Sequence, residues 1–255
     1  MHDQIHRSTA PVPDSWASRT QHPIWLAVAL VAAPVAASVA IGVVSALLWP
    51  QSDPTERRLV AVLAIMVAAV ALVAVTRGWH RTALQGPSTW RRTALLLVPA
   101  IVALAPLTTG FDLPATRALA VLVVGYAATG VFEEAWHRGV VLDVLRHQGL
   151  RRSALIGGVL FGVSHLANVA FGQGLFVSLA QAVGATCFGI GYSILRWRTA
   201  AVWLLVPIHA IGDLLLHITN ITGSALWAVM VAHDTIVLLW GLWCLRGAKD
   251  DVTAA

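Results

Sequence analysis

Long apolar runs separated by short polar connections are the feature that most limits the folds open to this chain. The runs cover residues 24–49, 59–76, 93–108, 115–145, 153–171, 175–195, 200–218 and 224–245. A helix needs about 17 to 25 such residues to cross a bilayer. Hydrophobic residues make up 58% of the 255 residues and charged residues only 11%, which is too apolar for one soluble core. The runs also lack the two-residue alternation of barrel strands, so the sequence predicts an all-α, polytopic membrane helix bundle with about eight transmembrane helices.

The chain shows no internal repeat and no linker long enough to divide it. We therefore expect a single domain over residues 23–246, with a polar N-terminal tail at 1–22 and a short C-terminal tail at 247–255. The first apolar run is too long for the core of a signal peptide, so we expect it to be a retained span.

Arginines are concentrated in every second connection between the runs. The basic connections hold Arg77, Arg81, Arg91, Arg92, Arg146, Arg151, Arg152, Arg196 and Arg198, whereas the alternate ones hold only Arg57, Arg58 and Arg117. The positive-inside rule then places both termini in the cytoplasm. The formal charge of +5 follows this topology instead of marking one basic face, so the expected partner is the lipid bilayer and not nucleic acid.

Two adjacent carboxylates, Glu133 and Glu134, interrupt the fourth apolar run. An acidic side chain near the bilayer centre costs about 2.5 to 3.5 kcal/mol on insertion scales, so the pair needs partners or a function. Glu133 and His137 are four residues apart, as are Glu134 and Arg138, so each pair shares a helix face and the two faces differ by about 100°. We predict that Glu134 forms a structural ion pair with Arg138 and that Glu133 faces a cavity.

Histidines in the fifth and seventh runs lie at the same depth as these carboxylates. Counted from the nearest arginine, Glu133, His165 and His209 are all about 16 to 20 Å from the basic connections. His209 and Asp213 share one helix stripe, and His165 shares a face with Asn168, which could serve its second ring nitrogen. The sequence thus predicts one polar cluster between three helices.

A second acidic and histidine pair lies in the last run. His233 and Asp234 have no motif around them, and we expect an interhelical hydrogen bond there.

The chemistry of this cluster suits hydrolysis. A carboxylate withdrawn from water is a stronger base, so Glu133 with His165 could deprotonate a trapped water that attacks a peptide carbonyl. His209 and Asp213 would then steady the oxyanion. A competing arrangement places Zn²⁺ on Glu133, His165 and His209. The sequence contains no His-Glu-x-x-His, so a zinc ion is compatible with these residues but not required by them.

Three motifs carry a resemblance to a known family. Glu133-Glu134-x-x-x-Arg138, Phe161-x-x-x-His165 and His209-x-x-x-Asp213 resemble the pattern of the CPBP (CAAX protease and bacteriocin-processing, Abi) family, which includes the CAAX prenyl endopeptidases. The resemblance implies an eight-helix intramembrane endopeptidase, metal-dependent or glutamate-based, with Glu133, His165, His209 and Asp213 in the catalytic positions. The last position is often Asn in the prenyl-protein enzymes. An ionised Asp213 cannot donate a hydrogen bond to an oxyanion, so it must be protonated or have another task.

Other functions use the same residues. A proton-coupled transporter could use them as a relay, and a membrane immunity or scaffold protein could keep the fold without catalysis. For the enzyme, the substrate would be a membrane-associated protein or peptide, with or without a lipid modification. The heavy use of Ala, Val and Arg with a single lysine suggests a bacterial plasma membrane.

Overall fold

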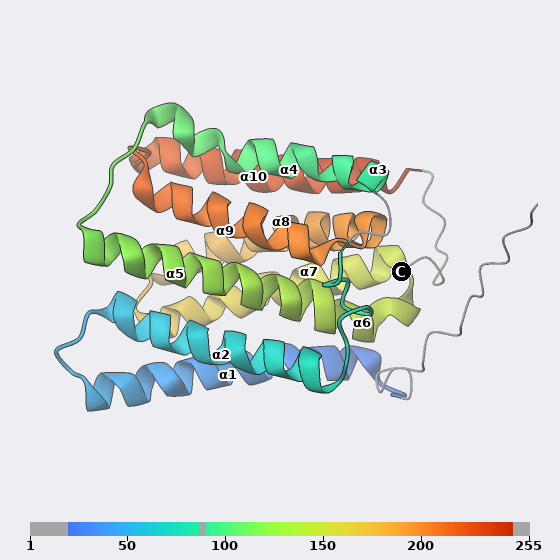
Figure 1. Cartoon of the computed structure of the whole chain (residues 1–255), viewed down its shortest axis with the longest axis horizontal. Helices are drawn as coiled ribbons and strands as arrows, with labels where there is room; N and C mark the ends of the chain where they lie inside the picture. The colour runs from blue at the N-terminus through green and yellow to red at the C-terminus, as the bar shows by residue number, and fades with distance from the viewer. Residues whose placement is uncertain (1–19, 87–89, 247–255) are drawn as a thin grey trace, which may run out of the picture.

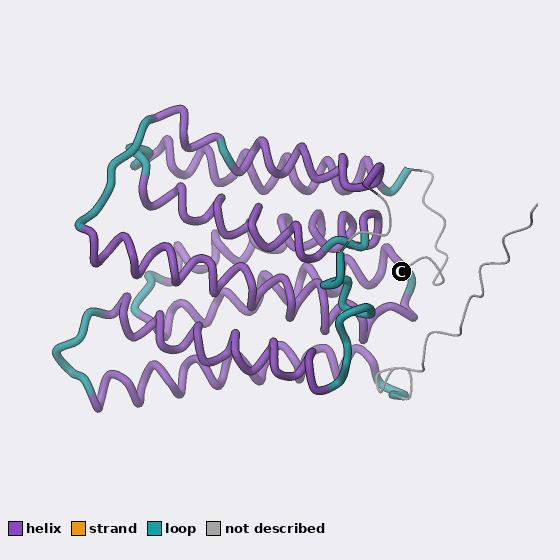
Figure 2. Tube along the Cα trace, in the orientation of Figure 1, coloured by secondary structure: helices purple, strands orange, loops and turns teal. Residues whose placement is uncertain are grey.

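In a computed structural model the chain forms one bundle of long helices lying side by side (Figure 1). The structure describes residues 20–86 and 90–246, so the two predicted tails lie almost entirely outside the described residues. Within these ranges there is no strand (Figure 2), and a single isolated bridge pairs Phe111 with Thr219. The prediction of an all-helical chain is therefore confirmed.

Each predicted apolar run corresponds to a helical segment. Six helices have the length and apolar composition to cross a membrane: α1 (Pro23–Leu48), α2 (Pro54–Val75), the continuous segment Thr116–Gln148, the segment Leu150–Phe171, α8 (Leu175–Thr199) and α10 (Gly223–Cys244). Two shorter apolar helices are Ala94–Thr109, which contains α4 (Leu97–Ala103), and α9 (Val202–Ile218). The remaining elements are α3 (Trp90–Thr93), α5 (Thr116–Glu133), α6 (Leu142–Leu145), α7 (Leu150–Ser164) and short 3₁₀ turns, among them His165–Phe171.

The start of α2 follows from its sequence. Asp53 precedes Pro54, and the Asp53 carboxylate accepts a hydrogen bond of 2.7 Å from the backbone N–H of Thr55. This is a standard N-cap with proline at the first helical position. Because the carboxylate is bonded in this way, the pKa of Asp53 is lowered from its ordinary value.

The long fourth run does not form a regular helix throughout. After α5, residues Glu134–Val141 form a π-helix in which every side chain is buried. Such wide turns are rare and are frequently found at functional sites. Contacts from other helices hold this turn: Trp136 donates a 2.8 Å hydrogen bond to the carbonyl of Leu30, and Arg196 donates one of 3.3 Å to the carbonyl of Arg138. The constant offset of 100° per residue assumed from the sequence therefore stops at Glu133.

Two apolar clusters hold the bundle together. One joins α1 and α2 to the π-helix and α6, and the other joins α7, α8, α9 and α10. Glycines bring the helices of the second cluster close together: a Cβ on Gly162 would collide with Thr186, and one on Gly241 would lie 2.8 Å from the Cα of Gly191. Small residues at these contacts allow the helix backbones to approach closely.

The outer surface and the two ends of the bundle differ in character. Large apolar side chains such as Ile101, Phe176 and Val231 are exposed on the outside, which suits contact with lipid. Helix α1 begins and α10 ends at the same end of the bundle, where α2 and α8 also end (Figure 1). At the other end, Arg117 pairs with Glu56 at 2.6 Å.

Candidate active site

His209 on α9 lies at the meeting point of the carboxylates singled out in the sequence. Its Nδ1 is 2.8 Å from Oε1 of Glu134, and its Nε2 is 3.6 Å from Oε2 of Glu133 and 3.4 Å from Oδ2 of Asp213. Gly130 allows this contact between α5 and α9, because a Cβ there would lie 2.9 Å from the Cβ of Ala210. The structure thus brings two other predicted catalytic residues, Glu133 and Asp213, together with Glu134, around the imidazole of His209.

Glu134 contacts two partners at once. Its Oε1 is 3.2 Å from a terminal nitrogen of Arg138, which is the ion pair expected from their spacing, and it also bonds His209. Spacing along one helix did not indicate that both glutamates would also reach the same histidine of another helix. The guanidinium of Arg138 lies over the ring of Phe161 at 4.1 Å, and both Glu134 and Arg138 are almost fully buried. Removing either member of such a buried ion pair is strongly destabilising, because it leaves the other charge buried without its partner.

His165 lies at the junction of α7 and the following 3₁₀ turn. Its Nδ1 is 2.9 Å from the carbonyl of Phe161, the first residue of its own motif. Asn168, expected to serve this ring, instead donates a 2.8 Å hydrogen bond to Gln181. The partner of the His165 ring is therefore the backbone carbonyl of Phe161, and the prediction that Asn168 serves this ring is wrong. With Nδ1 as the donor, Nε2 is the nitrogen that remains for chemistry.

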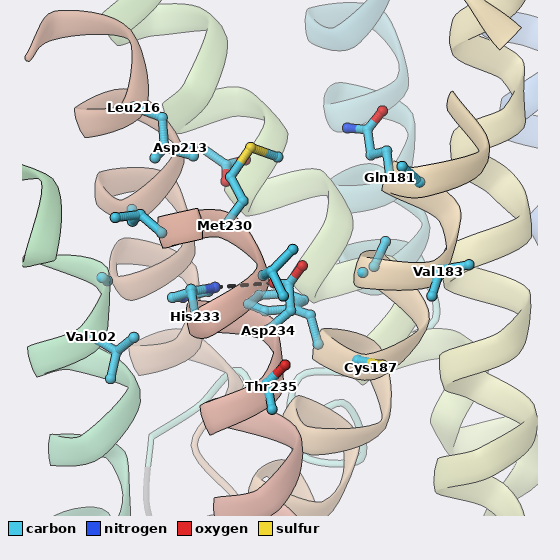
Figure 3. A pocket seen from close by; sticks show the side chains of 18 of the residues that line it. Val102, Gln181, Val183, Cys187, Asp213, Leu216, Met230, His233, Asp234 and Thr235 are labelled. Atoms are coloured by element: carbon cyan, nitrogen blue, oxygen red, sulfur yellow. Dashed lines mark hydrogen bonds and ion pairs between the residues drawn. The ribbon is translucent and has the colours of Figure 1, made fainter. Parts of the chain in front are cut away.

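His165 lines two cavities. The smaller, of about 110 Å³, is lined by Glu133, His137 and His165 among others, and the larger, of about 470 Å³, is lined by His165, His209 and Asp213. The prediction that Glu133 faces a cavity agrees with this arrangement. The larger cavity lies between α4, α8, α9 and α10 (Figure 3). Its volume is in the usual range for a bound ligand.

Sequence reasoning underrated two further polar sites. His137 is buried within the π-helix, edge-on to the ring of Phe161 at 4.9 Å. His233 and Asp234 line the larger cavity (Figure 3), and the bond between them, 3.1 Å from Nδ1 to Oδ1, joins neighbours on α10. The prediction of an interhelical hydrogen bond there is therefore wrong, because this bond lies within one helix. Adjacent ionisable side chains inside an apolar run, the same signal that drew attention to Glu133 and Glu134, are also present at His233 and Asp234.

The arrangement of these side chains does not form a ready metal site. Over residues 20–86 and 90–246, no group of three or more His, Cys, Asp or Glu side chains is placed to hold a metal ion. The proposed ligands are engaged by the protein: both ring nitrogens of His209 face carboxylates, and Nδ1 of His165 faces a carbonyl. These residues as placed do not fit a catalytic zinc set, which needs three ligands and an open position.

Comparison with known proteins places these motifs in a family. Residues 114–215 match the family described as Rce1-like, type II CAAX prenyl endopeptidase. No curated protein matches the chain. The matched segment begins before α5 and ends in α9, and so contains all three motifs. Over residues 114–215 the chain is thus similar to the type II CAAX prenyl endopeptidases, in agreement with the resemblance of its three motifs to the CPBP family.

Proposed function

We propose that this chain is an intramembrane endopeptidase that hydrolyses a peptide bond of a membrane-associated protein or peptide with a water activated by Glu133 and His165. The observation that carries the proposal is the convergence on His209 of Glu133, Glu134 and Asp213, in a cavity that His165 also lines. The protease family matched by this segment supports the same reaction class.

In the first step Glu133 accepts a proton from the water while Nε2 of His165 orients it. The water oxygen forms a bond to the scissile carbonyl carbon, and the carbonyl electrons move to its oxygen. In its imidazolium form His209 donates Nδ1–H to Glu134 and Nε2–H to this oxyanion, a type of contact often worth about 3 to 4 kcal/mol. The carbon–nitrogen bond then breaks, and the leaving amine takes the proton held by Glu133.

This scheme gives Asp213 a task that an ionised carboxylate can perform. Its Oδ2 is 3.4 Å from Nε2 of His209, on the same stripe of α9. A carboxylate at this position stabilises the imidazolium and fixes the ring, so it need not donate to the oxyanion itself. Asp213 is then a positioning residue, where the prenyl-protein enzymes often have Asn.

We further propose that residues 23–246 form a single protease domain with eight spans, that both termini are cytoplasmic, and that the protein resides in a bacterial plasma membrane. The orientation is supported by two observations. Helix α1 begins and α10 ends at the same end of the bundle, and the arginine-rich connections after α2 and α8 lie at that end too. The proposed eight spans are the six long helices and the two shorter apolar ones, Ala94–Thr109 and Val202–Ile218.

The test is cleavage of quenched fluorescent peptide libraries, with and without a prenylated cysteine, by purified protein in lipid nanodiscs. Glu133→Gln should lower kcat by about 10² to 10⁴, the usual contribution of a general base. His209→Ala should abolish cleavage, whereas His217→Ala serves as the matched control. His217 lies two turns along the same helix, is exposed and bonds Tyr126 at 2.9 Å.

The same assay separates the two hydrolytic chemistries. With a glutamate-activated water, zinc chelators should leave the rate unchanged and the purified protein should contain no stoichiometric metal. Undiminished cleavage by Glu133→Gln would refute the role of Glu133. Loss of wild-type cleavage on chelation, restored by zinc, would establish a metal mechanism instead.

A further inference from the structure

His233 and Asp234 form a second polar site in the larger cavity, outside the three motifs. Their side chains are 20% and 22% exposed, and both line the cavity that also holds His209 and Asp213 (Figure 3). Only one atom of each is used in the bond between them, Nδ1 of His233 and Oδ1 of Asp234. No further hydrogen bond joins Nε2 of His233 or Oδ2 of Asp234 to the described residues. Ionisable groups inside a membrane bundle are costly, and half-satisfied ones indicate a functional site.

The rest of this cavity is mainly apolar. Val102, Val183, Leu216 and Met230 contribute to its lining (Figure 3). The sequence also makes room for the carboxylate, because a Cβ on Gly184 of α8 would collide with Oδ2 of Asp234. A polar pair held in place against an otherwise apolar lining can fix the orientation of a ligand.

Phe188 fixes the distance between this pair and the hydrolytic cluster. Its ring centroid is 4.8 Å from that of His209 and 5.6 Å from that of His233, on which it stacks. The two histidine rings can be no further apart than these two spacings together. An extended peptide, rising about 3.3 Å per residue, covers that separation with about three residues.

We propose that His233 and Asp234 form a main-chain docking site for the substrate peptide. As an imidazolium and carboxylate pair they present one donor, Nε2–H, and one acceptor, Oδ2, which match the C=O and N–H of a residue in an extended peptide. The docked residue lies within about three residues of the scissile bond. A helical segment has these backbone groups already paired, so the site selects extended or unwound peptide with little regard to side-chain identity. This inference rests on the proposed function, since it names how the same cavity holds its substrate.

The experiment measures peptide binding without turnover. The full chain carrying Glu133→Gln is placed in nanodiscs, and the probe is the fluorescent library peptide that it binds most tightly. In a series of this peptide, one backbone N–H at a time is replaced by an ester oxygen. Each peptide is titrated against three proteins: the Glu133→Gln chain, called the parent, and the same chain with Asp234→Leu or His233→Leu added. Thr235→Val is the matched control, because Thr235 lines the same cavity next to the pair.

We expect one ester position to raise the Kd about tenfold or more for the parent, the loss typical of a hydrogen bond to a charged group. Asp234→Leu should raise the Kd of the unmodified peptide by a similar factor, and the same ester should then have no further effect. His233→Leu should weaken binding as well, while Thr235→Val should leave the ester profile unchanged. If Asp234→Leu does not fold, as judged by circular dichroism and size exclusion, Asp234→Asn takes its place.

The proposal is overturned if no ester is sensitive, if the ester and the Asp234 change act additively, or if no library peptide binds. The proposed function is judged separately by whether the chain with Glu133 intact cleaves the same peptide. If the ester effect disappears in Asp234→Leu but the chain cleaves no peptide, the docking site is kept and the protease assignment is refuted. If the chain cleaves the peptide but the ester effect is independent of Asp234, the protease assignment is kept and the docking site is refuted.

Discussion

Removing one or the other of the two adjacent glutamates should change the stability of the protein to very different extents. Glu134 is fully buried, forms an ion pair with Arg138 at 3.2 Å and is hydrogen-bonded to Nδ1 of His209 at 2.8 Å. The side chain of Glu133 is 18% exposed. Among the described residues its one ion-pair contact is with His209, and the 3.6 Å between Oε2 and Nε2 is longer than a normal hydrogen bond. Alanine at position 134 leaves the guanidinium of Arg138 buried without its anion.

The expected sizes of the two effects are well separated. Breaking a buried ion pair by removing one partner costs about 3 to 5 kcal/mol. That is a large part of the roughly 5 to 15 kcal/mol that stabilises a typical domain. Loss of the longer, partly exposed contact of Glu133 should cost less than about 1 kcal/mol. At about 2 to 4 °C per kcal/mol for a chain of this size, Glu134→Ala should lower the Tm by roughly 10 °C, and Glu133→Ala should lower it by a few degrees at most.

The assay is thermal unfolding of purified protein in one detergent, paired with peptide cleavage at a temperature where all variants are folded. Glu133→Ala should remain stable and inactive. The double variant Glu134→Ala with Arg138→Met should recover part of the lost Tm, because it removes both buried charges together. Equal loss of Tm in the two single variants, or no recovery in the double variant, would refute the assignment of Glu134 as the structural partner of Arg138.

Three further changes test the fold around the site. Gly130→Val should destabilise by about 1 to 3 kcal/mol and reduce cleavage, because its Cβ would lie 2.9 Å from a methyl of α9; Gly125→Ala, which meets only ordinary packing, should be neutral in both assays. Arg196→Gln should lower the free energy of unfolding by about 2 to 4 kcal/mol, since it removes hydrogen bonds from a buried charge to two backbone carbonyls. Asp53→Ala should lower the Tm at neutral pH by removing the cap on Thr55. Because the folded pKa of Asp53 is lowered, that difference should persist above the ordinary aspartate value of about 3.9 and vanish as the pH falls through the lowered pKa.

The sequence determined the solvent and the class of the fold. Whether a run can cross a bilayer depends on its length and apolarity, which are local properties of consecutive residues. All eight runs accordingly became helices. The polar residues that interrupted them, Glu133, His165 and His209, could be selected for the same reason, because each is costly where it lies. Their common depth followed from the fixed rise of a helix, and three of the four predicted catalytic residues meet in space.

The contacts within the cluster depended on information that spacing does not contain. The π-helix after Glu133 changes the direction of every following side chain, and the hydrophobic pattern of the run does not predict this π-helix. Asn168 shares a face with His165 but lies nearer to Gln181, which comes from α8. Helical spacing states which residues share a face, and it does not state which neighbour another helix brings to that face.

Only the tertiary structure decided which groups act together. His209 and Glu134 are 75 residues apart, and their bond exists because Gly130 lets α5 and α9 approach closely. The packing of α10 against α8 likewise brought His233 and Asp234 to the larger cavity, where the sequence had offered only an isolated polar pair. Hydropathy fixes how far each group lies along the bundle axis, whereas the shape of the packed helix surfaces fixes which groups touch across it.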